Sequence, residues 1–293
     1  MKHLKIKLIC EILIWFVGIW ILNKIFSDKS LLVSQIKQYL PHLQASMLVA
    51  MLWGDVSGIS KTFYNQMVAT GLIHILVVSG SNLMIVVKGL IELLAQWTGR
   101  KRAIIIGIMV GWFYVNIVGW QIPAVRAVVM VTIMYFGQLL GRQINLLRML
   151  FLVVLIMFLA DFKVLSSISF WMSFLAFIAV CQNPKEGVLK TTLRVNLYLL
   201  PILAWKFGYL SLIAPISNLM TLFLVETITI LGFVGIIIHP ILWLLYPFLV
   251  YIQKVVEILS IPSWVQIKVS FNMIMMIGSY LIGIGYYMRQ KHV

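Results

Sequence analysis

Charged residues are scarce in this sequence, and acidic residues are the scarcest. Only 11% of the 293 residues are charged, with 8 Asp and Glu against 23 Lys and Arg, while 62% are hydrophobic. A soluble domain of this length could not bury so much apolar surface, and about a quarter of an ordinary soluble chain is charged. The composition therefore excludes a soluble protein and predicts one whose apolar surface lies in lipid.

The sequence also lacks the motifs of several catalytic classes. It has no Walker-type phosphate-binding loop, which excludes ATP hydrolysis by this chain. The five histidines are scattered and none stands at zinc-site spacing, so we expect no metal and no other cofactor. Cys10 and Cys181 fall in different apolar segments and do not indicate a disulfide framework.

Long apolar runs are abundant instead. A bilayer span takes about 20 apolar residues, and fewer where the bilayer is thin. On this criterion we predict an all-α fold, a polytopic bundle of about 8–10 transmembrane helices. The candidate spans are residues 8–26, 72–97, 103–119, 123–141, 145–160, 164–181, 195–210, 212–238, 240–259 and 269–288. Residues 1–27 would form an uncleaved N-terminal transmembrane helix, and residues 72–293 the main transmembrane domain.

Residues 28–71 have a different pattern. From Ser30 to Trp53, apolar residues recur at helical spacing with polar residues between them, and Pro41 interrupts the series. A turn at residues 54–58 follows, and Ser60 is a suitable N-cap for a short amphipathic helix. We therefore predict an amphipathic region that lies on the membrane surface.

The basic residues predict the orientation of the chain. With the N-terminus in the cytoplasm, more than half of the 23 Lys and Arg fall on short inner loops, in line with the positive-inside rule. The uncharged turn at 238–240 is an inner exception, and the outer connections between the later spans hold only Lys163, Lys206 and Lys268. Much of the net charge of +15 is thus explained by topology and does not by itself indicate a nucleic-acid ligand.

Three polar interruptions of the apolar segments are candidates for chemistry. The first runs from Gly71 to Asn82 and includes His74, Ser79 and Gly80. A glycine between two serines can break a membrane helix, and the freed backbone groups are tolerated only against protein or a water-filled cavity. The segment is interpreted either as a pore-lining bend or as a helix-packing patch of small residues.

The second interruption is Pro123 followed by Arg126. Proline suits the first turn of a helix, and a bare cation one turn later is expensive in lipid. Arg126 could extend to the outer interface, or it could hold a phosphate or a buried carboxylate in an aqueous path.

The third interruption is the segment from Pro215 to Asn218, followed by Glu226 within a long apolar run. An intramembrane carboxylate is a functional candidate by default. An ion pair with Arg126, a hydrogen bond to His74 and a protonated Glu226 among helix contacts all remain open. Elsewhere, Lys88 and Glu92 stand four residues apart and are expected to pair along one helix face.

A series of short motifs occurs in a recognisable order along the chain. They are MLWGDVSG at 51–58, GLIHILVVSGSN at 71–82, PAVRAVVM at 123–130, LLGRQINLLR at 139–148, FWMSFLAF at 170–177 and APISNLM at 214–220. Together they resemble the competence domain of the ComEC-type DNA-uptake proteins, over roughly residues 45–240.

The resemblance implies a channel, not an enzyme, that passes single-stranded DNA across the bacterial cytoplasmic (inner) membrane during natural transformation. Carried onto this chain, the family's signature residues are Asp55, His74, Ser79, Gly80, Pro123, Arg126 and Asn218. Besides single-stranded DNA and membrane lipids, the expected partners are a separate extracytoplasmic DNA receptor and a cytoplasmic motor or helicase, because the chain has no motor of its own.

Two departures from the family pattern bear on these expectations. The second histidine of the family's SGxH pattern is Asn82 here, which keeps hydrogen bonding but cannot carry a proton charge. The sequence also shows no OB-fold-like part and no metallo-β-lactamase-like part, so we expect no nuclease activity from this chain. Two interpretations stay open: a minimal or divergent form of the family, or a protein whose other parts are separate polypeptides.

Two other functions remain open. A proton-coupled transporter of a small or lipidic substrate would use Glu226 and His74 as a proton relay. An intramembrane serine hydrolase would use Ser79 as nucleophile, with His239 as a conceivable base, although the first glycine of a GxSG-like motif is missing. In the channel hypothesis, Arg126 contacts phosphate on the outer side and the bend from His74 to Asn82 shapes the constriction.

Overall fold

The protein is an all-α membrane helix bundle. The computed structural model describes residues 29–76, 80–142, 145–182, 187–262 and 265–291, and within these ranges it has twelve α-helices, two short 3₁₀ helices and one pair of three-residue strands. The predicted fold class is therefore confirmed. The two strands were not expected from the sequence.

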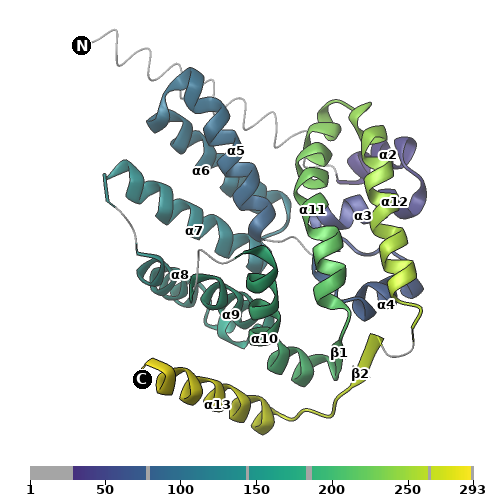
Figure 1. Ribbon diagram of the computed structural model, residues 1–293. Helices are drawn as coiled ribbons and strands as arrows, with labels where there is room; N and C mark the ends of the chain where they lie inside the picture. Colours follow the sequence, from purple (N-terminus) through teal and green to yellow (C-terminus); the bar gives the residue numbers. More distant parts are fainter. Residues whose placement is uncertain (1–28, 77–79, 143–144, 183–186, 263–264, 292–293) are drawn as a thin grey trace. The chain divides into compact units, whose positions relative to one another are not determined.

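The elements follow one another along the chain as Figure 1 labels them. They are α2 (Lys29–Tyr39), α3 (His42–Trp53), α4 (Lys61–Ala69), η1 (Ile73–Leu76), α5 (Gly80–Thr98), α6 (Arg100–Ile117), α7 (Ile122–Leu139), α8 (Leu146–Ala160), η2 (Phe162–Ser166), α9 (Ile168–Gln182), α10 (Val188–Phe207), β1 (Tyr209–Ser211), α11 (Ala214–Ile237), α12 (Ile241–Leu259), β2 (Gln266–Lys268) and α13 (Met273–Lys291).

Three of these helices, α7, α11 and α12, are long and apolar enough to cross a membrane. Eighteen residues of α-helix rise about 27 Å, close to the thickness of the hydrocarbon core. Four shorter apolar stretches, His42–Trp53, Arg148–Ala160, Ile168–Gln182 and Met273–Gly283, fall below that length. They need a thinner bilayer or help from flanking residues to serve as spans.

The described residues fall into two compact units, which we treat separately. Unit 1 draws on the described residues within 1–59, 75–157 and 225–250, and unit 2 on those within 60–74, 158–224 and 251–293. In unit 1, α6 packs against both α5 and α7 through two glycines four residues apart. A Cβ on Gly107 would lie 2.3 Å from Ile91 of α5, and one on Gly111 would lie 3.1 Å from Val128 of α7. Small residues at this spacing let membrane helices approach closely.

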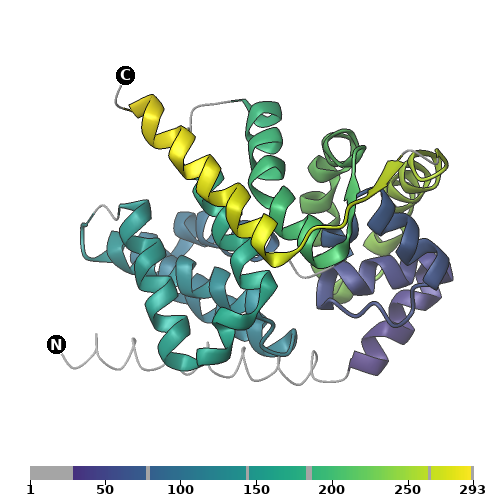
Figure 2. The same cartoon turned by 90° about the horizontal axis from the view of Figure 1, so that it is seen from below.

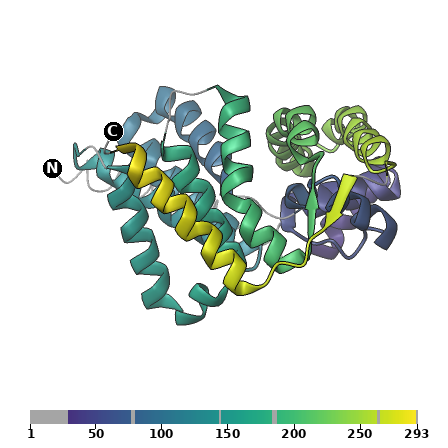
Figure 3. The same ribbon diagram turned by 60° about the horizontal axis from the view of Figure 1, so that its bottom comes forward.

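In unit 2, α10 packs between α9 and α13. The Tyr280 hydroxyl of α13 donates a hydrogen bond to the Tyr198 carbonyl of α10 (2.9 Å), and Figure 2 shows the two helices side by side. The strands β1 and β2 pair antiparallel, with Tyr209 opposite Lys268 and Ser211 opposite Gln266. This ladder joins the segment before α11 to the segment after α12, as Figure 3 shows.

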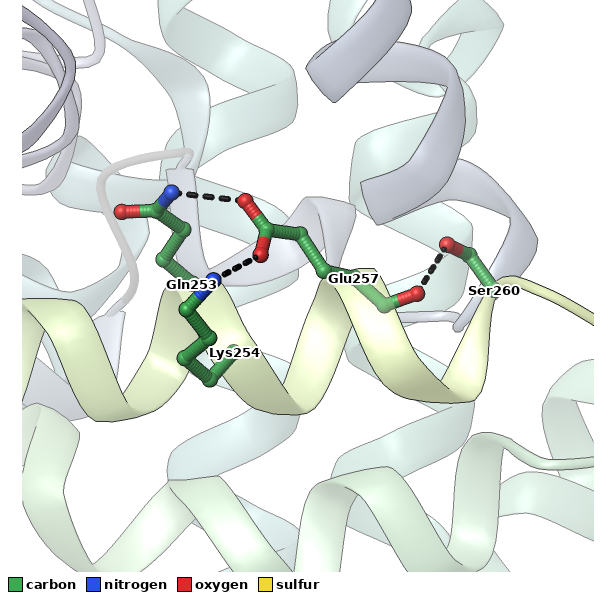
Figure 4. A network of polar contacts seen from close by, with 4 residues as sticks. All are labelled: Gln253, Lys254, Glu257 and Ser260. Atoms are coloured by element: carbon green, nitrogen blue, oxygen red, sulfur yellow. Dashed lines mark hydrogen bonds and ion pairs between the residues drawn. The ribbon is translucent and has the colours of Figure 1, made fainter.

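The last turn of α12 carries a small polar network, drawn in Figure 4. Glu257 accepts hydrogen bonds from Gln253 (2.6 Å) and Lys254 (2.7 Å), and the Ser260 hydroxyl donates to the Glu257 carbonyl (3.0 Å). The carboxylate and one terminal carbonyl of an otherwise apolar helix are thereby satisfied. The network is typical of a helix end at a water interface and adds little stability where it is exposed.

The structure differs from the amphipathic surface helix predicted for Ser30–Trp53. Every side chain from Gln44 to Trp53 of α3 is buried. The Ser46 hydroxyl donates to the His42 carbonyl in the same helix (2.8 Å), which satisfies its polarity without water. A Cβ on Gly232 of α11 would lie 3.0 Å from Leu48, so α3 packs closely on α11. The location of residues 28–71 at a membrane surface remains a prediction.

The contacts near the two ends of α3 bear on the predicted topology. Just before α3, Tyr39 stacks on His239 of the α11–α12 turn, with ring centroids 5.7 Å apart. At the end of α3, Trp53 is bound by Gln121 of the α6–α7 turn. The predicted topology puts these two turns on opposite sides of the membrane, and the course of α3 relative to the membrane remains a prediction with it.

Candidate functional site

The first turns of α5 and α7 lie against each other in unit 1. A Cβ built on Gly80 would lie 3.1 Å from the Ala127 Cβ, 3.4 Å from the Pro123 carbonyl oxygen and 4.0 Å from a guanidinium nitrogen of Arg126. The Arg126 side chain is half-buried. Gly80 therefore leaves the space that α7 and the Arg126 side chain occupy, and the structure brings the first and second polar motifs together here.

A 3₁₀ helix covers Ile73–Leu76, and α5 is described from Gly80 onward. Residues 77–79 lie outside the described residues, so the predicted interruption around Gly80 remains a prediction. Ser79 lies outside the described residues, as does the side chain of Asn82, although its backbone belongs to α5. Their proposed roles at the bend therefore remain predictions.

The turn at Gly54 and Asp55, which follows α3, is held by α6 and by the α6–α7 turn. Tyr114 donates from its hydroxyl to the Leu52 carbonyl (3.2 Å), and Gln121 donates from Nε2 to the Trp53 carbonyl (3.1 Å). Gly54 adopts φ 71°, and a Cβ there would lie 2.7 Å from Gln121 Nε2. Asp55 accepts a hydrogen bond from the Ser57 backbone and forms the turn. The signature residues Asp55, Gly80, Pro123 and Arg126 thus belong to connected elements of unit 1.

Replacing Gln121 by alanine is expected to destabilise this arrangement. The half-buried Trp53 carbonyl would lose its donor, which costs about 1–3 kcal/mol. Thermal unfolding of the detergent-solubilised protein measures the effect. Gln138→Ala is the matched control, because Gln138 is exposed near the other end of α7 and should change stability by less than about 0.5 kcal/mol. Equal melting temperatures of Q121A and Q138A would contradict a stabilising role for the bond from Gln121 to the Trp53 carbonyl.

A second group of motif residues meets in unit 2. The helix α4 ends with Leu72 N–H donating to the Met67 carbonyl and Gly71 N–H to the Val68 carbonyl, the Schellman arrangement, with Gly71 at φ 75°. A Cβ on Gly71 would lie 2.5 Å from the Ala214 Cβ, at the start of α11. The first and third polar motifs therefore touch at Gly71 and Ala214.

Hydroxyl and amide groups surround this contact. The Ser217 hydroxyl donates to the Thr70 carbonyl (2.6 Å), and the Thr221 hydroxyl donates to the Ser217 carbonyl (2.8 Å). Asn218 is 7% exposed, and its Oδ1 atom is buried without a hydrogen-bond partner among the described residues, as is the Ser211 Oγ. A buried acceptor without a donor destabilises the fold, so these oxygens are expected to meet water or a ligand.

His74 and Glu226 are not brought into these contacts. The His74 Nδ1 lies 3.0 Å from the Gly71 carbonyl, which can only accept, so Nδ1 carries the proton in this bond. Glu226 is exposed near the middle of α11. Neither an ion pair of Glu226 with Arg126 nor a hydrogen bond to His74 is among the contacts that the described residues show.

Sequence reasoning gave little weight to the residues that hold the motifs. Gln121, Tyr114 and Ser217 all donate hydrogen bonds to backbone carbonyls at helix ends. The usable signal was local: Gln121 stands just before Pro123, and Ser217 stands within the PISN segment. Their partners, however, are 62 to 147 residues away in the chain, which periodicity cannot reveal.

Comparison with known proteins gives one family. Residues 51–291 match the model of the family described as Competence protein, so the match begins in the last turn of α3 and includes both groups of motif residues. No curated protein and no solved structure matches the chain.

Proposed function

The chain belongs to the competence protein family, and from this premise we propose that it passes single-stranded DNA across the bacterial cytoplasmic membrane. The family gives the protein a role in DNA uptake, and the apolar helices make it a membrane protein.

The observation that carries the proposal is the position of Arg126. It lies one turn into a helix long enough to span the membrane, beside a glycine that leaves it room. A guanidinium is costly in hydrocarbon but binds phosphate oxygens through a rigid fork of donors. A strand of DNA brings a phosphate with every nucleotide, so a half-buried arginine at the end of a span supports a phosphate contact.

The group around Gly71 and Ala214 adds a second argument. A translocating DNA strand needs polar partners within the membrane, because burying its phosphates without water or hydrogen-bond partners is costly. The unpartnered Asn218 Oδ1 and Ser211 Oγ supply acceptors that favour water nearby. We propose that water around these oxygens hydrates part of the DNA path.

No observation favours the proton-relay or hydrolase alternatives. His74 already uses Nδ1 on the Gly71 carbonyl, and Glu226 is exposed on α11. Ser79 lies outside the described residues.

We propose that an extracytoplasmic receptor delivers the DNA and that a cytoplasmic motor or helicase supplies the driving force.

Deleting the gene from the bacterium that carries it tests the function. In competent cells, labelled duplex DNA should still bind at the surface, while nuclease-resistant single strands inside the cell should fall to background. The wild-type gene supplied in trans should restore them. Internal strands at the parental level in the deletion strain would overturn the proposal.

A further inference from the structure

Trp120, in the turn before α7, has an unusual backbone conformation. Among the described residues it is the non-glycine residue with positive φ, at 57°, and it follows Gly119 at φ 77°. Residues with a side chain rarely adopt this region, and when they do the surroundings must enforce it. The Trp120 side chain is nevertheless 57% exposed, so its own burial is not the reason.

Three contacts hold the turn in place. The Trp120 N–H donates to the Val115 carbonyl (3.0 Å) as part of the end of α6, and the next residue, Gln121, is tied to the Trp53 carbonyl. The Trp112 ring lies 6.2 Å from the Trp120 ring, and the Trp112 Nε1 donates to Thr132 of α7 (3.1 Å). The Trp112 indole, held by Thr132, therefore lies beside the exposed Trp120 ring.

We propose that Trp120 is a stacking platform for an unpaired base of the incoming DNA strand. This inference rests on the proposed function and adds a base contact to its phosphate contact. Aromatic side chains bind single strands without sequence preference because every base has a stacking face. Trp120 stands three residues before Pro123 and six before Arg126, so the two contacts would lie at the start of one helix.

The backbone strain favours this role over a membrane anchor. Interfacial tryptophans anchor helices without a fixed orientation. Trp97 and Trp243 are 83% and 69% exposed within regular helices, as expected for such anchors. The Trp120 backbone is instead held in a strained turn and its ring contacts the Trp112 ring, which favours a positioned stacking surface over an anchor.

The test uses the full-length chain in lipid nanodiscs and three probes: a dye-labelled dT oligonucleotide, an abasic strand with the same phosphates, and the matching duplex. The wild-type protein should bind the dT strand more tightly than the abasic strand. Trp120→Leu keeps an apolar side chain but loses the indole. It should weaken binding of the dT strand about five- to a hundredfold and leave the affinity for the abasic strand unchanged. Trp120→Phe should retain most of the preference.

Trp243→Leu is the matched control and should bind as the wild type does. Trp120→Gly relieves the strain and keeps the test valid if leucine impairs folding. A dT preference that persists in both the leucine and glycine variants would overturn the stacking role while the proposed function stands. If Trp120→Leu binds the dT strand as the wild type does and Trp120→Gly does not, Trp120 is a membrane anchor, which would also overturn the stacking role. A wild-type protein that binds neither strand would remove the proposed function together with this inference.

Discussion

Replacing Arg126 by alanine is expected to lower entry of single-stranded DNA about ten- to a hundredfold, the range for losing a hydrogen bond to a charged group. The guanidinium lies one turn into α7, where a Cβ on Gly80 would come within 4.0 Å of it. Arg126→Lys should recover part of the entry, because lysine keeps the charge but not the planar fork of donors. Entry of labelled strands into competent cells measures all three proteins at matched membrane levels.

Arg142→Ala controls for the loss of one positive charge. Arg142 is exposed after α7 on a predicted inner loop, so its removal should leave entry near the wild-type level. Raising the salt concentration should reduce the difference between wild type and R126A, since phosphate contacts are screened. An R126A strain that takes up DNA as the wild type does, with normal protein in the membrane, would rule out this phosphate contact.

The second large effect is expected at Gly71. Alanine there meets both the positive φ of 75° and a Cβ contact of 2.5 Å with Ala214. The left-handed conformation costs about 1–2 kcal/mol and the overpacking about 1–3 kcal/mol. Gly71→Ala should therefore lower the melting temperature of the solubilised protein by roughly 5 °C or more.

Two further variants separate the causes. Gly71→Ala combined with Ala214→Gly removes the contact but not the strain, so it should recover only part of the loss. Gly89→Ala is the control, because nothing lies within 4 Å of a Cβ there and alanine favours the helix by about 1 kcal/mol. If G71A and G89A melt together, the packing of α4 against α11 does not depend on this glycine.

The helical elements were predictable because composition and length determine them. The spans expected at 123–141, 212–238 and 240–259 correspond closely to α7, α11 and α12. The Lys88–Glu92 pair is also present, at 3.9 Å, since four residues make one turn of helix. Such features depend on neighbours in the sequence, which is why the sequence suffices for them.

The burial of α3 could not be predicted in the same way. Its polar residues predict a face exposed to water, but the Ser46 hydroxyl donates its hydrogen bond to the His42 carbonyl of the preceding turn. The partner that covers α3 includes Gly232, almost two hundred residues later. The periodicity of apolar residues indicates which faces of a helix differ in polarity. It cannot reveal that a helix distant in the sequence covers the polar face as well.

Contacts between motif residues are present, while the roles predicted for the site residues remain predictions. The motif glycines and Pro123 do meet other motif residues, Gly80 with Arg126 and Gly71 with Ala214. The sequence hypothesis, however, gathered His74, Asn82, Arg126 and Asn218 around one wet passage. Arg126 belongs to unit 1 and Asn218 to unit 2, so that convergence remains a prediction.

The small ladder of β1 and β2 imposes a parity on the membrane crossings. Segments that exchange backbone hydrogen bonds, as Tyr209–Ser211 and Gln266–Lys268 do, must share one face of the bilayer, because such bonds cannot reach across about 30 Å of hydrocarbon. The chain between them must cross an even number of times. Hence α11 and α12 either both traverse the bilayer or neither does, and reversing the whole protein leaves that pairing unchanged.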